Sequence, residues 1–304
     1  MEAVMRRILF IYNRHAGKNK TWFGLSDMIN AMTEHNCLVT AFPTQYRGSV
    51  TDIIRERGHD YDQIVIAGGD GTLSEAISSA RKMDPVPVIG YIPLGTTNDF
   101  SRNLDLPSTK DIGEVAATAV TGVPQTHDLG SFNNQDFLYV AAFGAFAQVS
   151  YSTPQAMKNV LGYNAYILEG ALNLTSIKPH HIKVEYDGNV IEGDYLYGMV
   201  SNTTSVGGVK NFPPGNPDLS DGLLEVTLIS PIRGIKTVEE FGRAVLSGDP
   251  SVLSSVLTSF STPKVTITSE AGLTWTLDGE PGGTHQVAEI EALHNAYTIV
   301  HGES

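Results

Sequence analysis

Short apolar runs alternate with longer amphipathic segments in the first part of the chain. The apolar runs, each followed by turn-like residues, predict strands at 8–13, 37–43, 63–68 and 86–94. Apolar residues recur at helical spacing around 23–32, 49–57 and 72–82. This alternation predicts βαβ units, in which helices cover both faces of a parallel sheet. Right-handed crossovers then place the strand-to-helix loops along one sheet edge, where ligands bind in such folds.

The pattern changes after about residue 130, where alternating polar and apolar residues take over. Strands are expected within 181–202, 223–230, 264–269 and 273–280, and helices at 162–174, 235–247 and 250–258. Asp187-Gly188 predicts a type I′ hairpin turn. We therefore expect an α/β domain over 1–132 and a β-sandwich-like domain over 133–292. The segment 293–304 is a candidate for completing the first domain.

Composition narrows the class of protein. The chain has 304 residues, of which 41% are hydrophobic, enough for about two domains with sizeable cores. No apolar run reaches the roughly 20 residues that a membrane-spanning helix needs. The N-terminus reads as a strand and not as a signal peptide, and Cys37 is the single cysteine, so we expect a cytoplasmic protein without disulfides. A net charge of −13 argues against nucleic-acid binding and against a polybasic membrane tether.

A glycine-rich segment, Gly68-Gly69-Asp70-Gly71-Thr72, follows the third predicted strand. Glycines let backbone N–H groups approach a bulky anion, and the helix N-terminus that follows adds free donors. The pattern is typical of a phosphate cradle, although it is neither a Walker A loop nor a dinucleotide fingerprint. A tight turn in which Asp70 caps the helix is the competing interpretation.

Acidic residues recur at three neighbouring strand ends. Asp70 would repel a phosphate unless a cation lay between them, so it indicates Mg²⁺ or a base near a hydroxyl. The loop PLGTTNDF (93–100) again combines glycine, hydroxyls and an acid, Asp99, and HDLG (127–130) supplies Asp128. The parallel sheet predicts that these three acids converge on one cleft.

Two further groups of acids lie in the β-rich part. Asp218 and Asp221 share a Pro-rich loop, where two carboxylates and a carbonyl would suit a hard cation. Asp278-Gly279-Glu280 ends a predicted strand, which fits a hairpin turn or a general base that receives a hydroxyl proton.

The segments GGDGT and PLGTTNDF, with YNRHAGK before them and DLSDGLLEV and TLDGEP after them, resemble the diacylglycerol kinase catalytic family. The likeness is greatest to its soluble bacterial lipid kinases and spans nearly the whole chain. It implies ATP-dependent phosphorylation of a lipid hydroxyl, for example of diacylglycerol to phosphatidic acid, between an α/β domain and a β-sandwich domain. Arg14 stands where the family pattern has proline, so the first loop departs from it.

The resemblance also implies roles for individual residues. The implied nucleotide-binding residues are Asn13, Thr44, Gly68, Gly69, Asp70, Gly71, Thr72, Leu73, Ser74, Gly95, Thr96, Asn98 and Asp99. Asp70, Asp99 and Asp128 would surround Mg²⁺, and a second magnesium would bind Asp218, Asp221 and the carbonyl of Leu223. Glu280 is the leading candidate for the proton acceptor, with Asp278 beside it, and the choice between them stays open.

Two other functions compete with a lipid kinase. An NAD kinase-like enzyme would share Gly-Gly-Asp-Gly-Thr, but PLGTTNDF fits lipid kinases better. A non-catalytic nucleotide- or lipid-binding regulator is the third hypothesis, although every expected acid is present. Several lipids offer a suitable hydroxyl, so the acceptor stays open. For a lipid kinase we expect reversible, peripheral contact with a membrane surface, and relatives suggest a homodimer.

Overall fold

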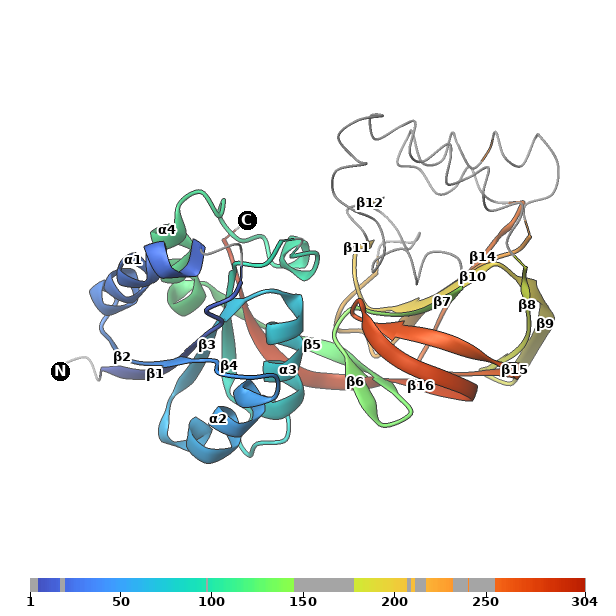
Figure 1. The fold of residues 1–304 in the computed structure, drawn as a ribbon, viewed down its shortest axis with the longest axis horizontal. Helices are drawn as coiled ribbons and strands as arrows, with labels where there is room; N and C mark the ends of the chain where they lie inside the picture. The colour runs from blue at the N-terminus through green and yellow to red at the C-terminus, as the bar shows by residue number, and fades with distance from the viewer. Residues whose placement is uncertain are drawn as a thin grey trace. The chain divides into compact units, whose positions relative to one another are not determined.

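The computed structural model describes residues 5–16, 20–96, 98–144, 178–206, 209–210, 217–231, 240 and 255–303. The chain divides into two compact units (Figure 1). The first unit comprises Met1–Leu129 with His294–Ser304, and the second comprises Gly130–Leu293. Two strands, β5 (Val123–Phe132) and β16 (Glu280–His301), begin in one unit and end in the other.

The first unit is built on a parallel sheet. Its strands are β1 (Arg6–Tyr12), β2 (Cys37–Pro43), β3 (Gln63–Gly68) and β4 (Val88–Pro93), in the spatial order β2-β1-β3-β4. The end of β16 continues the sheet, because Thr298 pairs with Val88 in parallel register. Every residue of β3 is buried, as expected for a central strand with both faces covered.

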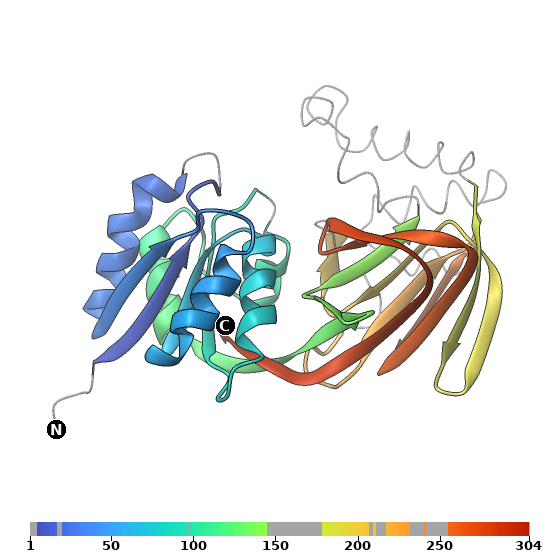
Figure 2. The same cartoon turned by 60° about the horizontal axis from the view of Figure 1, so that its bottom comes forward.

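Helices cover both faces of this sheet. They are α1 (Lys20–Glu34), α2 (Ser49–Arg57), α3 (Asp70–Ala80) and α4 (Ile112–Thr121), with short 3₁₀ helices η1 (Gly58–Asp60) and η2 (Phe100–Asn103). Helices α1 and α4 pack together on one face, and α2 and α3 on the other (Figures 1 and 2). The predicted parallel sheet with helices on both faces is therefore confirmed.

The second unit is antiparallel and rich in strands. Its strands are β6 (Gln135–Phe137), β7 (Val140–Gly144), β8 (His180–Tyr186), β9 (Asn189–Tyr195), β10 (Tyr197–Ser201), β11 (Ser205–Val206), β12 (Val209–Lys210), β13 (Leu224–Ile229), β14 (Leu257–Thr262) and β15 (Lys264–Leu277). The order β14-β13-β10-β7-β15-β16 forms its main sheet, and β8 joins β15 to β9. Trp275 lies in its core, where its ring centroid is 4.9 Å from that of Phe132 and 4.9 Å from that of Phe143.

The hairpin turns from β8 to β9 and from β15 to β16 use positive φ angles. Asp187 (φ 46°) and Gly188 (φ 75°) join β8 to β9, which confirms the predicted I′ turn. Asp278 (φ 50°) and Gly279 (φ 82°) join β15 to β16 in the same way.

Some predicted helix positions differ from those observed. Helix α3 begins at Asp70 and not at about 72, so Gly71 and Thr72 belong to its first turn. The prediction of a helix at 250–258 is wrong at its end, because β14 begins at Leu257. The predicted helices at 162–174 and 235–247 lie outside the described residues, except for Glu240. None of the helices in the described ranges is long and apolar enough to cross a bilayer.

Candidate functional site

Three loops meet at the carboxyl edge of the parallel sheet because β1, β3 and β4 are adjacent. Asn13 follows β1 and links it to the next loop: its backbone N–H donates to the carbonyl of Ala67 (2.8 Å), and its side-chain Nδ2 donates to Oγ1 of Thr72 (3.2 Å). Leu94 donates its N–H to the carbonyl of Gly68 (2.7 Å), which ties the loop after β4 to the same segment.

Backbone crowding explains two of the glycines. A Cβ atom added to Gly95 would lie 2.7 Å from the Cα of Gly69, closer than Cβ atoms approach other atoms. A Cβ on Gly69 would lie 3.3 Å from the Cα of Gly95. The two loops therefore touch backbone to backbone, and a side chain at either position would separate them.

Gly71 has no such packing reason. It is exposed in the first turn of α3, and an added Cβ would meet nothing within 4 Å. The N-cap of this helix is Gly69, which has no side chain to accept a hydrogen bond from the first turn. An uncapped helix start with no Cβ at its second residue is suited to binding an anion.

Asp70 does not cap its own helix, so the competing interpretation of a capping turn is wrong. Its Oδ2 accepts a hydrogen bond from the backbone N–H of Asp99 at 2.9 Å. Asp99 is 7% exposed, and its Oδ1 lies 3.8 Å from Nε of Arg102. The structure thus brings these two acids together.

Tyr91 supports the same loops and was not identified from the sequence. Its hydroxyl donates to the carbonyl of Gly68 (3.2 Å). Burial, and secondarily the negative charge of Asp70, raise the pKa of Tyr91 well above its usual value, so the hydroxyl remains a donor. Its position inside an apolar strand hides this role from sequence inspection.

Asp128 is fully buried, with partners from β16. Its Oδ1 accepts from the backbone N–H of Asn295 (2.7 Å) and lies 2.9 Å from Nδ1 of His294. Among the described residues, no group of three or more acids, cysteines or histidines lies close enough to hold a metal ion by itself. Asp70 and Asp99 still suit Mg²⁺, which proteins often bind through one or two carboxylates together with phosphate and water oxygens.

The other predicted nucleotide residues lie on the same edge. Thr44 follows β2 and donates its N–H to the carbonyl of Tyr12 (2.9 Å). Asn98 has φ of 49° and closes the second loop, because its Nδ2 donates to the carbonyl of Gly95 (3.0 Å). Thr96 is exposed, Ser74 is half-buried, and Leu73 points into the core.

Asp278 and Glu280 have different surroundings. The carboxylate of Asp278 accepts three backbone hydrogen bonds, from the N–H groups of Leu138 (2.6 Å), Tyr139 (2.9 Å) and Val140 (3.1 Å). Asp278 therefore holds the segment before β7 against the β15–β16 turn. Glu280 is exposed at the start of β16.

The acidic loop before β13 is ordered by its own turns. Oδ1 of Asp218 accepts from the N–H (3.0 Å) and hydroxyl (2.8 Å) of Ser220, and Oδ1 of Asp221 accepts from the N–H of Leu223 (2.9 Å). A third acid, Glu225, lies just inside the strand and was missed from the sequence. Burial, and then the charges of Asp221 and Asp218, raise the pKa of Glu225 to about 7.

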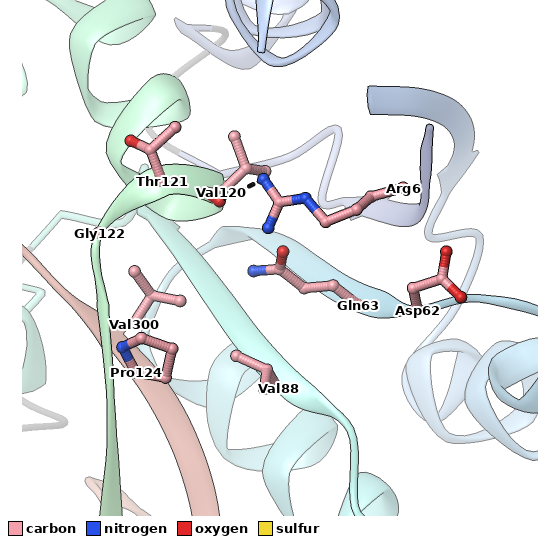
Figure 3. Close-up of a pocket in the computed structure, with 9 residues that line it drawn as sticks. All are labelled: Arg6, Asp62, Gln63, Val88, Val120, Thr121, Gly122, Pro124 and Val300. Atoms are coloured by element: carbon pink, nitrogen blue, oxygen red, sulfur yellow. Dashed lines mark hydrogen bonds between the residues drawn. The ribbon is translucent and has the colours of Figure 1, made fainter. Parts of the chain in front are cut away.

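A cavity of about 480 Å³ lies at the opposite edge of the first unit, where the parallel strands begin (Figure 3). Arg6 and Gln63 are among the residues that line it, and Nη2 of Arg6 donates to the carbonyl of Val120 at 2.6 Å. None of the predicted site residues lines this cavity.

Comparison with known proteins identifies the family. The diacylglycerol kinase catalytic domain matches residues 7–132, and the YegS C-terminal NAD kinase beta sandwich-like domain matches residues 140–300. The diacylglycerol kinase of Bacillus subtilis (strain 168) is 30% identical over 280 residues, which cover 92% of this chain and 91% of that protein. The chain belongs to the diacylglycerol kinase family.

Other relatives agree with this assignment. The diacylglycerol kinase of Staphylococcus aureus (strain bovine RF122 / ET3-1) is 31% identical over 284 residues, covering 91% of this chain and 87% of that protein. The resemblance deduced from the motifs and the enzyme class, a lipid kinase, are thereby confirmed.

Solved structures share the fold. A crystal structure of a diacylglycerol kinase from Bacillus anthracis str. Sterne has a TM-score of 0.76 at 21% identity and covers 99% of this chain and 98% of that chain. A second crystal structure from the same organism has a TM-score of 0.81 at 24% identity, with 99% and 97% covered. The predicted fold class, an α/β domain followed by a β-sandwich-like domain, is confirmed.

Proposed function

We propose that the protein transfers the γ-phosphoryl group of ATP to the hydroxyl of diacylglycerol or a related lipid, with Mg²⁺, to give a phospholipid such as phosphatidic acid. The observation that carries the proposal is the meeting of two glycine loops with Asp70 and Asp99 at one sheet edge. That arrangement supplies phosphate-binding N–H groups and cation-binding carboxylates together.

In this proposal the first unit binds the nucleotide. The start of α3 receives the phosphates, because it is uncapped and carries Gly71 where a side chain would intervene. Asn13 and Thr44 lie along the nucleotide from the ends of β1 and β2, and Thr96 contributes from the second loop. Asn98 and Gly95 shape that second loop through their hydrogen bond.

Asp70 and Asp99 would hold Mg²⁺, and Asp128, buried on β5, is the third acid that the family resemblance implies. When bound, the ion would supply neutralisation of the charge that builds up on the phosphoryl oxygens during transfer. Asp218, Asp221 and the carbonyl of Leu223 would hold a second cation, which would stabilise the loop before β13.

Glu280 acts as the proton acceptor. The lipid hydroxyl oxygen bonds to the γ-phosphorus, the bond from that phosphorus to the β–γ bridging oxygen breaks, and the hydroxyl proton moves to the carboxylate of Glu280. Asp278 is a poorer acceptor because its oxygens already accept three backbone hydrogen bonds. Asp278 instead positions the turn that carries Glu280.

The second unit binds the lipid, which the protein meets by reversible, peripheral contact with a membrane surface. A net charge of −13 requires that this contact be local and not a general attraction to anionic lipid. The family resemblance further supports a homodimer.

The test offers competing acceptors to the full chain. ATP labelled at the γ-phosphate is supplied with Mg²⁺, a mixed lipid extract containing diacylglycerol, and NAD, and products are identified by mass spectrometry. We expect the label in phosphatidic acid or a related phospholipid. Rapid labelling of NADP with inert lipid would instead establish an NAD kinase, and ATP binding without turnover would establish a regulator.

A further inference from the structure

Glu225 is an acid enclosed within the main sheet of the second unit. It lies on β13 between Ser201 of β10 and Ser261 of β14 in antiparallel register. Its side chain is buried, since the residue is 5% exposed. Because directly opposed residues of antiparallel strands point to the same face, the side chains of Ser201 and Glu225 are neighbours on one face of the sheet.

Two oxygens at this place lack hydrogen-bond partners. Oε2 of Glu225 and Oγ of Ser201 are both buried, and neither makes a hydrogen bond to any residue that the structure describes. Buried polar atoms are usually satisfied, and a carboxylate is the most costly one to leave unsatisfied. Two such atoms on paired residues point to a ligand or water at the site.

The charges of the described neighbours favour a cation as that ligand. Among the residues that the structure describes, the side-chain charges that act on Glu225 are those of Asp221 and Asp218, and both are negative. The loop that carries them is joined to the end of β10 because Nδ2 of Asn202 donates to the carbonyl of Leu219 (3.4 Å). Three acids thus gather around the end of β10 and the start of β13.

We propose that Glu225 and Ser201 complete the cation site of Asp218 and Asp221 by binding water molecules of the hydrated ion. This inference rests on the proposed second cation site. The three carboxylates do not lie close enough for all to bind one metal ion directly, so water lies between Glu225 and the ion. Mg²⁺ suits this arrangement because it loses its water reluctantly and keeps several water ligands in proteins.

The test measures Mg²⁺ binding by the full chain without substrates, by calorimetry and by thermal unfolding. Glu225→Gln keeps the shape of the side chain and removes its charge. We expect it to lower Mg²⁺ affinity about 10- to 100-fold, as losing an outer-shell partner does. Without Mg²⁺ the same variant should unfold at a higher temperature than the wild type, because a buried unpaired charge is gone.

Three more variants complete the design. Asp218→Asn, which removes a direct ligand, should abolish binding. Ser201→Ala should also weaken Mg²⁺ binding, as Glu225→Gln does. If Glu225→Gln does not fold, Ser201→Ala provides the test. Glu270→Gln makes the same chemical change at an exposed position of β15 and should bind Mg²⁺ like the wild type.

Two outcomes would overturn the inference. Wild-type Mg²⁺ affinity in both Glu225→Gln and Ser201→Ala, with binding lost in Asp218→Asn, would show that the site exists without them. The lack of any Mg²⁺ binding at this loop in the wild type would remove the site itself. Lipid phosphorylation measured on the same preparations reports on the proposed kinase function separately.

Discussion

Oδ2 of Asp70 accepts a hydrogen bond from the backbone N–H of Asp99 at 2.9 Å. This contact joins Asp70, the first residue of α3, to the loop after β4. The backbone of Asp99 therefore orients the carboxylate of Asp70. Asp70 therefore has a structural role, since it connects the start of α3 to the loop after β4, and a proposed role in binding the cation. Substitutions can separate these two roles.

Asp70→Asn should abolish most activity and leave the fold intact. The amide oxygen of the asparagine can still accept from the Asp99 N–H. The negative charge that would hold the cation is removed. We expect kcat for lipid phosphorylation to fall at least about 100-fold, the scale of losing one preorganised electrostatic group. The melting temperature should stay near the wild-type value. Asp27→Asn, an exposed acid on α1, is the matched control, and full activity in Asp70→Asn would contradict the assigned role.

Gly71→Ala should separate stability from nucleotide binding. The added methyl group meets no atom within 4 Å, and alanine favours a helix over glycine by about 1 kcal/mol. The free energy of unfolding should therefore hold or rise. If phosphates approach this backbone, the KM for ATP should rise about 10-fold or more, since 1.4 kcal/mol corresponds to tenfold in affinity. An unchanged KM would show that the nucleotide lies elsewhere.

Gly95→Ala should have the opposite signature. Its new Cβ would lie 2.7 Å from the Cα of Gly69, so the two loops must move apart. We expect a loss of about 1–3 kcal/mol in the free energy of unfolding, typical of overpacking, together with lost activity. Urea unfolding of Gly95→Ala and Gly71→Ala side by side gives the comparison. Equal stability of the two variants would mean that the loops do not touch as described.

Glu280→Gln and Asp278→Asn should fail in different ways. Removing a general base lowers kcat by about 10²–10⁴-fold, which we expect for Glu280→Gln with its melting temperature unchanged. Asp278→Asn weakens the hydrogen bonds from Leu138, Tyr139 and Val140, each of which gains strength from the charge. It should lower the free energy of unfolding by about 1–3 kcal/mol. A stable, inactive Asp278→Asn beside an active Glu280→Gln would exchange the two roles.

The strands of the first unit are predictable from the sequence because each is a short apolar run that ends in turn residues. The run at 63–68 coincides with β3, which is buried throughout, as a central strand covered on both faces must be. The run at 37–43 coincides with β2, which lies at the edge of the sheet and is only partly buried. Helix α4 was not predicted, although Asp111 and Glu114 mark its start. Oδ1 of Asp111 accepts from the backbone N–H of Glu114 at 3.0 Å. In a short alanine-rich helix the spacing of large apolar residues is hard to recognise, so the capping residues are the better indication of where it begins.

The candidate site was predictable only as a set of residue types. The motifs point to Asp70, Asp99 and Asp278, but the sequence does not show that Asp278 is occupied by three backbone donors. Glu225 escaped attention because its burial depends on strand register, which places it between two neighbouring strands. Roles that depend on long-range contacts require coordinates.

A buried histidine pair makes acid sensitivity predictable. Nε2 of His301 lies 2.8 Å from Nε2 of His127, so one ring donates and the other accepts, which requires at least one neutral ring. His301 is 5% exposed, and His127 also contacts the ring of Tyr297. Burial lowers the pKa of His301 below its usual value of 6.5, and the charge of Asp105 opposes that shift only in part.

The free energy of unfolding should therefore fall as the pH drops below 6.5. Above pH 6.5 His301 is neutral in both the folded and the unfolded chain, so its effect on stability is fully favourable. Below pH 6.5 the unfolded chain binds a proton at His301 more readily than the folded chain, which lowers the free energy of unfolding. This loss ends below the pKa of His301 in the folded chain. His301→Gln can still form a hydrogen bond with His127 but cannot titrate, so its unfolding free energy should depend less on pH in this range. Urea unfolding of both proteins between about pH 5 and 8, where histidine titrates, measures this difference. Parallel pH profiles for the two proteins would rule out His301 as the source of the acid sensitivity.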